Sequence, residues 1–475
     1  MHQLGRVAVA ACGFAWATLL GFTAHADNQT PTTTPITVGG QSLPFGLQLQ
    51  RVDTGGKLPT LQSFAAAQYG NLWVLIGGRT NGLHNFTSDP LKNFPPSEQN
   101  RRIWVIDPTT WQVWSRSIKG SGLTGDQVDQ LSATNYEHDT IGDTLYMVGG
   151  YGYQRSTKKF VTFPVMTAVD LPALIKWVRE PAASPKLAKL IRQTTSETLR
   201  VTGGQMMIFG KRAVLAFGQD FAGGYGDPNV VQTYTGQVRS FDIVDTGTKL
   251  SIADVKASPK VPDLVNYRRR DYTMVPFLDG GQAKAAALAG VFTESGGVFT
   301  VPVEMGAAGI PHQDDPAAKS TFKQGMNSYD GATVGIYDSD TGATHSLLFG
   351  GISYITYDRA TQKFVPDPNA PFTNQITDLV RDKQGHYRQY LFPTEFPKVG
   401  GPDVASYLFG AEARFWVRPQ TPVKGPGLID LAALRAKPGN SQVVGWIFGG
   451  IAAEQPNFGQ TVASNEVFRV VLVDR

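Results

Sequence analysis

The sequence contains a single cysteine among 475 residues, and only 17% of its side chains are charged, against roughly 25% in an ordinary soluble domain. One cysteine excludes a disulfide scaffold and any zinc or iron–sulfur site built on several thiolates. The formal net charge of +4 is too small for a nucleic-acid-binding surface, so no nucleic-acid partner is expected. The seven histidines include no HxH or HxxxH pair, and no metal or cofactor is predicted.

Long apolar runs are also missing, except at the N-terminus. Residues 7–22 carry no charge, follow Arg6 and precede the small-x-small motif Ala24-His25-Ala26. Residues 1–26 are therefore predicted to be a cleaved signal peptide, which makes the protein exported, either periplasmic or extracellular. No transmembrane segment is expected after cleavage. The alternative is a lipid anchor at Cys12. If the signal peptide is cleaved after residue 26, the mature chain contains no cysteine.

Glycine and aromatic residues are abundant instead. The chain has 52 Gly, 26 Phe, 16 Tyr and 8 Trp, and 41% of its residues are hydrophobic, which is ample for a core and excludes wholesale disorder. At about 150 residues per domain the length would suggest three domains, but large all-β folds break that rule. The composition favours many short strands joined by tight turns.

An apolar strand that ends in a glycine doublet recurs along the chain. Four clear copies end at Gly78, Gly150, Gly351 and Gly450, and two degraded copies lie at residues 214–219 and 287–291. Each copy follows another strand-like segment, and the first continues through the turn Asp107-Pro108-Thr109 into two further strands. Such a unit is a four-stranded antiparallel sheet, which cannot bury both of its faces alone, so the copies are expected to stack radially.

This pattern of a glycine doublet, then Tyr/Phe-Asp, then Trp resembles the kelch motif. The resemblance to kelch-type β-propellers covers residues 46–475 and implies an all-β propeller of four-stranded antiparallel blades, and the six copies of the repeat predict six blades. The chain stops after the third strand of the last unit, so residues 46–52 are expected to supply its fourth strand and close the ring. Residues 27–45, rich in Thr and Pro, are predicted to be a linker.

Three short helices are expected in the insertions between strands. They are predicted over residues 168–177, 184–193 and 428–435, the second with Ser184 as N-cap and Pro185 at the first helical position.

Two enzymes are similar to this fold, and the residues that each would require can be compared with this sequence. Galactose oxidase implies a copper site with a Cys–Tyr crosslink, and a mature chain without cysteine excludes that chemistry. Sialic-acid epimerases imply acid–base residues at the channel mouth without a metal. Here the candidate catalytic residues are Glu137, His138 and Arg268, because a desolvated Glu or His suits general base work and Arg can hold a carboxylate.

Further polar residues fall in segments expected to line the channel and are candidates for ligand binding. They are Asp139, Glu197, Arg269, Arg270, Asp271, Tyr329, Asp330, Glu412 and Arg414. The alternative is that these residues have a structural role, since polar residues on inner strands commonly form hydrogen bonds to neighbouring blades.

We expect an exported, non-catalytic binding or scaffolding module whose partner is an unknown protein or glycan. The first alternative is a sugar-acid isomerase or epimerase acting through Glu137, His138 and Arg268. The second is a structural subunit of a cell-surface assembly, which requires an exposed apolar patch on the helices at 168–193.

Overall fold

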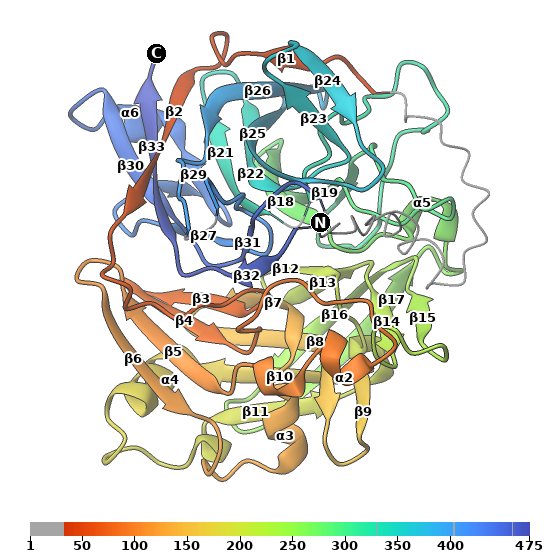
Figure 1. Ribbon diagram of the computed structural model, residues 1–475, viewed down its shortest axis with the longest axis vertical. Helices are drawn as coiled ribbons and strands as arrows, with labels where there is room; N and C mark the ends of the chain where they lie inside the picture. Colours follow the sequence, from red (N-terminus) through yellow and green to blue (C-terminus); the bar gives the residue numbers. More distant parts are fainter. Residues whose placement is uncertain (1–32, 330, 402–403, 458) are drawn as a thin grey trace, which may run out of the picture.

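The computed structural model describes residues 33–329, 331–401, 404–457 and 459–475. The predicted signal peptide with Cys12, residues 27–32 of the predicted linker, and Asp330 lie outside these ranges. Almost all regular structure is β-sheet, and the sheets are arranged around a common centre as in a β-propeller (Figure 1). The all-β fold of antiparallel sheets is therefore confirmed.

Five of the sheets contain four antiparallel strands in the order expected for a blade. From the innermost strand outward they are β3 (Ala65–Tyr69), β4 (Leu72–Ile76), β5 (Arg102–Asp107) and β6 (Gln112–Ser117); β7 (Thr134–Ile141), β8 (Thr144–Gln154), β10 (Val165–Asp170) and β11 (Ile191–Thr195); β12 (Gln205–Phe209), β13 (Arg212–Ala216), β16 (Val238–Asp245) and β17 (Leu250–Ser258); β21 (Ala332–Asp338), β22 (Ala343–Ile352), β25 (Phe372–Arg381) and β26 (Tyr387–Glu395); and β27 (Arg414–Val417), β30 (Ser441–Phe448), β33 (Val467–Asp474) and β2 (Phe45–Val52). Adjacent strands in each of these blades pair antiparallel, and β2 joins the last blade from the other end of the chain.

The expected count of six four-stranded blades is wrong. The fourth copy of the repeat forms a sheet of only three strands, β18 (Thr273–Asp279), β19 (Gln282–Leu288) and β20 (Val303–Met305). The chain that follows β20, residues 306–326, is rich in Gly, Pro and Asp. Because proline cannot donate to a strand ladder and glycine weakens a strand, this segment does not supply a fourth strand.

The glycine doublets share one backbone conformation in all six copies. Gly149 has φ +67°, and a Cβ placed there would lie 2.0 Å from the carbonyl oxygen of Val201, so the close approach of the next blade requires glycine. In the two degraded copies the first glycine is replaced by Phe217 and Ala289, and both keep the positive φ, at 51° and 57°. The repeat is thus conserved in backbone shape where its sequence has faded.

The N-terminal strand lies against the C-terminal one. β2 pairs antiparallel with β33 along its whole length, from Phe45 opposite Asp474 to Val52 opposite Val467. Leu47 points into the core and is 5% exposed. Part of the predicted linker also joins a sheet, since β1 (Thr37–Val38) pairs parallel with β26.

Apolar side chains pack between neighbouring sheets. Where the β3 blade meets the β27 blade, Trp73 stacks on Trp416 with ring centroids 4.8 Å apart, and Phe448 packs beside them. These side chains come from opposite ends of the sequence, so this interface depends on the circular arrangement.

Several short elements complete the fold. At the edge of β21 lie β28 (Val423–Lys424) and β29 (Leu428–Asp430), and β9 (Lys159–Thr162) pairs with β8. Three ribbons follow glycine doublets, namely β14 (Gln219–Ala222) with β15 (Val231–Tyr234), β23 (Ile355–Asp358) with β24 (Lys363–Pro366), and β31 (Ile451–Ala453) with β32 (Thr461–Ala463). Hairpins therefore extend from the ends of several blades at the side where the doublets lie.

The helices in the described ranges are few and short. They are α2 (Pro90–Asn93), α3 (Gly125–Gln130), α4 (Leu171–Arg179), α5 (Leu264–Tyr267) and α6 (Leu431–Arg435), with 3-10 turns η1 (Pro96–Glu98), η2 (Leu187–Lys189) and η3 (Glu197–Leu199). The helix predicted over 184–193 is wrong, because that segment contains η2 and then enters β11. The other two begin later than predicted, each after an aspartate cap: Asp170 accepts from the N–H of Ala173, and Asp430 from that of Ala433.

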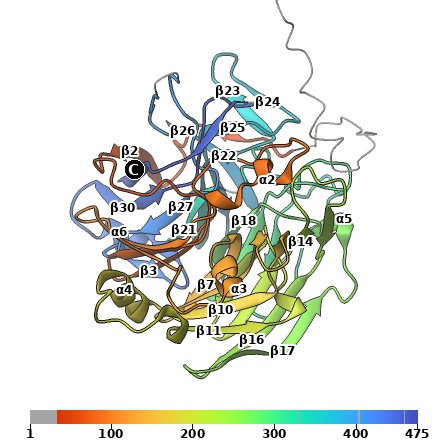
Figure 2. The same cartoon turned by 60° about the horizontal axis from the view of Figure 1, so that its bottom comes forward.

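Helix α4 lies at the outside of the ring against β5 and β6 (Figure 2). Its apolar side chains, among them Leu174 and Trp177, are buried in the core between the first two blades. The exposed apolar patch that the cell-surface-assembly alternative requires is therefore not present on α4. No helix in the described ranges is long and apolar enough to span a membrane.

Candidate ligand-binding cavity

A cavity of about 140 Å³ lies where the innermost strands begin. Near the start of five of these strands one residue adopts the left-handed conformation, and it and the residue before it line the cavity. These ten residues are Gln62, Ser63, Thr134, Asn135, Thr202, Gly203, Arg270, Asp271, Ala411 and Glu412. The cavity thus occupies the centre of the ring at its doublet side.

Backbone contacts fix this ring of residues. The N–H of Asn135 donates to the carbonyl of Ser63 over 3.1 Å, and the N–H of Asp271 donates to that of Gly203 over 2.9 Å. The hydroxyl of Thr202 donates to the carbonyl of Asn135 over 3.2 Å. Since successive blades are bonded to one another here, the floor of the cavity is preformed.

Arg79, directly after the first glycine doublet, is the most deeply buried charge in the wall. It is 1% exposed, its guanidinium lies 3.5 Å from the ring centre of Phe94, and its Nε donates to the side-chain oxygen of Asn81 over 3.0 Å. Burial lowers the pKa of Arg79 to about 10, so it remains a cation at neutral pH. Its Nη1 is buried without a hydrogen-bond partner among the described residues.

Arg270 supplies a second guanidinium to the cavity. It is 9% exposed, lies 4.2 Å from the ring centre of Phe292, and has its Nε 3.6 Å from a carboxylate oxygen of Asp271. Burial opposes its charge, but neighbouring Tyr234, Asp271 and Tyr225 outweigh burial and raise the pKa of Arg270 overall. Arg270 is therefore charged and partly neutralised by Asp271.

Aromatic rings form the side of the cavity next to the two arginines. His84 stacks on Tyr225 with ring centroids 3.6 Å apart, and Phe86 meets His84 edge-on at 4.6 Å. Burial and then the charges of Arg270 and Arg79 lower the pKa of His84 to about 3, so the imidazole is neutral. Burial raises the pKa of Tyr225 to about 12. The cavity therefore sets two cations beside a neutral aromatic wall.

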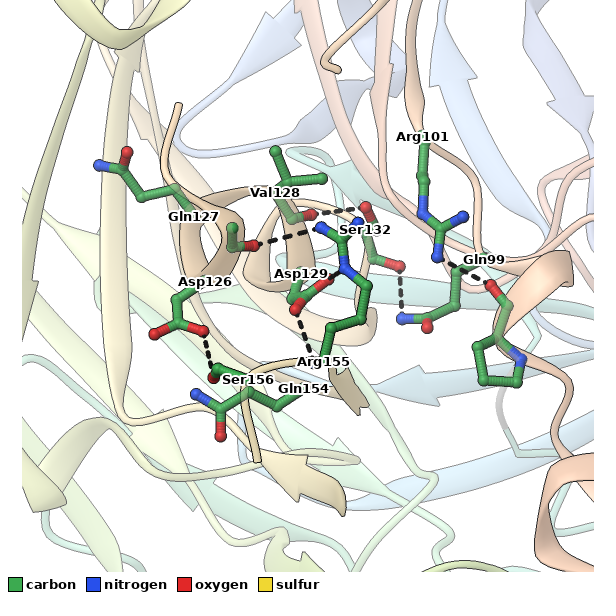
Figure 3. Close-up of polar contacts among 12 residues, drawn as sticks. Gln99, Arg101, Asp126, Gln127, Val128, Asp129, Ser132, Gln154, Arg155 and Ser156 are labelled. Carbon is green, nitrogen blue, oxygen red and sulfur yellow. Dashed lines mark hydrogen bonds and ion pairs between the residues drawn. The ribbon is translucent and has the colours of Figure 1, made fainter. Parts of the chain in front are cut away.

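A cluster of polar contacts ties α3 to the turn that follows β8 (Figure 3). Asp129 of α3, 2% exposed, pairs with Arg155 at the tip of the β8–β9 hairpin, with Nε and Oδ1 2.6 Å apart, and Asp126 accepts from the hydroxyl of Ser156 over 2.6 Å. β8 also carries Tyr151, which lines the cavity and whose hydroxyl donates to the carbonyl of Gly223 over 2.8 Å.

Four of the sequence-predicted binding residues line the cavity, and they are Arg270, Asp271, Tyr329 and Glu412. Four others are not among its lining residues, and three of these make structural contacts. Asp139 accepts from the N–H of Ile208 in the next blade, and Glu197 is an exposed partner of Arg200. Arg269 is fully buried and donates to the carbonyls of Ala289 and Val301, and Arg414 has a buried Nε without a partner in the described ranges.

The three predicted catalytic residues do not line the cavity. Glu137 is 1% exposed and accepts from the N–H of Gly204 over 2.8 Å. His138 accepts at Nε2 from the N–H of Ala66 over 3.0 Å, and its Nδ1 lies 3.2 Å from the carbonyl of Tyr136. Arg268 packs 3.9 Å from the ring centre of Tyr234. Their acid–base role stays a prediction, since these contacts join blades and loops rather than form one site.

The titration of Glu137 and His138 also follows from burial. Burial raises the pKa of Glu137 to about 8, and burial together with the charge of Arg414 lowers the pKa of His138 to about 3. Both side chains are therefore mainly neutral at pH 7.

Sequence reasoning missed Arg79, although a signal for it existed. The residue after the doublet lines the cavity in five of the six copies, and these residues are Arg79, Tyr151, Gln219, Ile352 and Ile451. The same register that repeats the doublet thus repeats a cavity position. No group of three or more His, Cys, Asp or Glu side chains in the described part of the chain is arranged to hold a metal ion.

Comparison with known proteins gives no family. No family model matches the chain, and no curated protein matches it. Among solved structures, that of YjhT is similar over 88% of this chain and 100% of its own, with 11% sequence identity and a TM-score of 0.42.

Proposed function

We propose that this chain is an exported binding module that holds a small anionic ligand in the central cavity. The observation that carries the proposal is Arg79, a buried cation in the cavity wall whose Nη1 has no partner among the described residues. A buried donor without a partner costs about 1–3 kcal/mol, more when it is charged, so a ligand oxyanion that accepts from it recovers that free energy. A carboxylate suits guanidinium geometry especially well.

The other lining residues support an anion that also carries hydroxyl groups. Asp271 and Glu412 accept hydrogen bonds, Gln62 and Asn135 both donate and accept, and the rings beside them take an apolar face. Export rests on the signal-like residues 1–26. We also infer that the pairing of β2 with β33 closes the ring and so keeps the cavity in one shape.

The test is calorimetric titration of the protein with sugar acids such as glucuronate, set against the matched neutral sugar. Arg79→Gln should weaken binding of the acid about 10- to 150-fold, because a charge-assisted hydrogen bond contributes about 1.5–3 kcal/mol. Arg79→Lys keeps the positive charge but lacks the paired N–H donors of the planar guanidinium, so its affinity for the acid should lie between those of the wild type and Arg79→Gln. Arg102→Gln changes the net charge equally at an exposed site and should bind like the wild type.

Thermal unfolding of each variant separates loss of fold from loss of the site. If the wild type binds no acid in the panel, or binds acid and neutral sugar equally well, the proposal is wrong. The same titrations report turnover of the sugar, which would instead support the isomerase alternative.

A further inference from the structure

A larger groove of about 670 Å³ opens beside the cavity. Five residues line both, and they are Leu83, His84, Phe86, Tyr329 and Ile352. Three connections supply most of its lining: residues 81–86 after β4, residues 369, 370 and 372 before and into β25, and residues 455–457 and 459–461 between β31 and the start of β32. A ligand in the cavity can therefore continue into the groove without leaving the protein surface.

The connections are tied to one another. The N–H of Leu83 donates to the hydroxyl of Thr461 over 2.8 Å, and the N–H of Phe372 donates to the carbonyl of Pro456 over 2.9 Å. The side-chain amide of Asn457 donates to a carboxylate oxygen of Asp367 over 2.7 Å. These bonds join loops of three blades, so the groove is preformed and little ordering is needed on binding.

The chemistry of the groove differs from that of the cavity. None of its described lining residues is Asp, Glu, Lys or Arg. Its aliphatic polar side chains are six amides and one hydroxyl, namely Asn81, Asn85, Asn369, Gln455, Asn457, Gln460 and Thr461, and its aromatic rings belong to His84, Phe86, Tyr329 and Phe372. Amides both donate and accept, as sugar hydroxyls do, and the faces of the rings suit the apolar faces of sugar rings.

We propose that the groove binds the uncharged residues of a glycan whose acidic terminal residue occupies the cavity. This rests on the proposed function and extends it from a small anion to an oligosaccharide. Binding sites for ligands of drug size have about 300–1,000 Å³, so the cavity alone holds only a small group, while the groove has room for a larger one. Gln455 and Gln460 are exposed and unbonded through their side chains in the described contacts, which leaves them free for ligand hydroxyls.

An acidic peptide is the competing occupant. It would bring several charges, which a groove without cations does not pair, and would need a strand edge for its backbone. The glycan therefore fits the groove better, and the peptide is an arm of the test.

The experiment is calorimetric titration of the full chain with glucuronic acid, galacturonic acid and 6-sulfated galactose, each free and as the terminal residue of a trisaccharide with two neutral sugars. A trisaccharide of three neutral sugars and an acidic hexapeptide are titrated alongside. The best trisaccharide should bind at least tenfold more tightly than its own monosaccharide. Gln455→Ala/Gln460→Ala should remove that gain and leave the monosaccharide affinity unchanged. Gln112→Ala, at an exposed site on β6, is the matched control and should change neither.

The outcomes separate the two proposals. Equal affinity for monosaccharide and trisaccharide overturns the groove and leaves the anion site standing. Tight binding of the neutral trisaccharide, without any effect of the acidic residue, supports the groove and contradicts the anion site. Absence of binding across the whole panel overturns both, and binding of an acidic hexapeptide that depends on Gln455 and Gln460 overturns the glycan as occupant.

Discussion

The stability of this protein should fall as the pH rises toward neutrality because of one carboxyl group. Glu137 is 1% exposed, accepts one hydrogen bond at Oε1 from Gly204, and has an Oε2 without a partner in the described ranges. Burial raises its pKa from 4.5 to about 8. Between these values the folded protein keeps the proton while the unfolded chain releases it, so folding becomes less favourable with each pH unit.

The magnitude follows from the width of that window. A group that is protonated in the folded state and ionised in the unfolded state changes the free energy of unfolding by about 1.4 kcal/mol per pH unit. Across the window this amounts to at most about 5 kcal/mol, a large share of a typical total of about 5–15 kcal/mol. Glu137→Gln keeps the acceptor for Gly204 and cannot ionise, so its stability should lack this slope.

Guanidinium chloride unfolding of both proteins at pH 5, 6 and 7 measures the effect. The wild type should lose about 3 kcal/mol relative to Glu137→Gln between pH 5 and 7, the two-unit share of that slope. Glu294→Gln, at an exposed position, serves as the control and should follow the wild type at every pH. A constant difference between wild type and Glu137→Gln would show that Glu137 is ionised in the fold, and it would refute the argument that Glu137 is a structural acid that keeps its proton.

Two further substitutions test the fold. Gly149→Ala should be at least about 2 kcal/mol more destabilising than Gly142→Ala in denaturant unfolding: both have positive φ, but only at Gly149 does the new Cβ meet the backbone of the next blade, and equal costs would contradict the close approach. Leu47→Ala in β2 should cost about 2–5 kcal/mol while exposed Gln48→Ala stays within about 0.5 kcal/mol, and a neutral Leu47→Ala would count against β2 as part of the core.

Much of the fold was predictable because the repeat is defined by the backbone conformations of a few consecutive residues. A doublet such as Gly149-Gly150 demands residues that tolerate positive φ, and the short apolar run before it predicts a strand, so both can be recognised without knowing the partners. The blade count was not predictable in this way. The three-stranded sheet at β18 follows from a segment whose Gly and Pro content prevents a fourth strand, and a degraded doublet at residues 287–291 does not reveal how many strands follow it.

The helix over 184–193 was mispredicted for a related reason. Ser184-Pro185 is a good local start, but β10 offers a free edge to Ile191–Thr195, and pairing with that edge satisfies more backbone than a short exposed helix would.

The candidate site was predicted only in part. Arg270, Asp271, Tyr329 and Glu412 stood out as polar groups at the starts of inner strands, and they line the cavity. Neighbouring Glu137 and His138 looked equally promising, because a sequence does not distinguish a side chain that bonds the next blade from one that faces the centre.

By itself, then, the sequence determined an all-β chain of repeated antiparallel sheets, since strand periodicity and glycine doublets are properties of a few consecutive residues. Only the tertiary structure decided where charge is left unsatisfied. Arg79, His84 and Tyr225 meet because the ring brings loops of different blades to one mouth, and the buried Nη1 of Arg79 exists only where that packing excludes water. Desolvation depends on neighbours distant in the sequence, and for that reason the cavity and its groove emerge from the fold rather than from any motif.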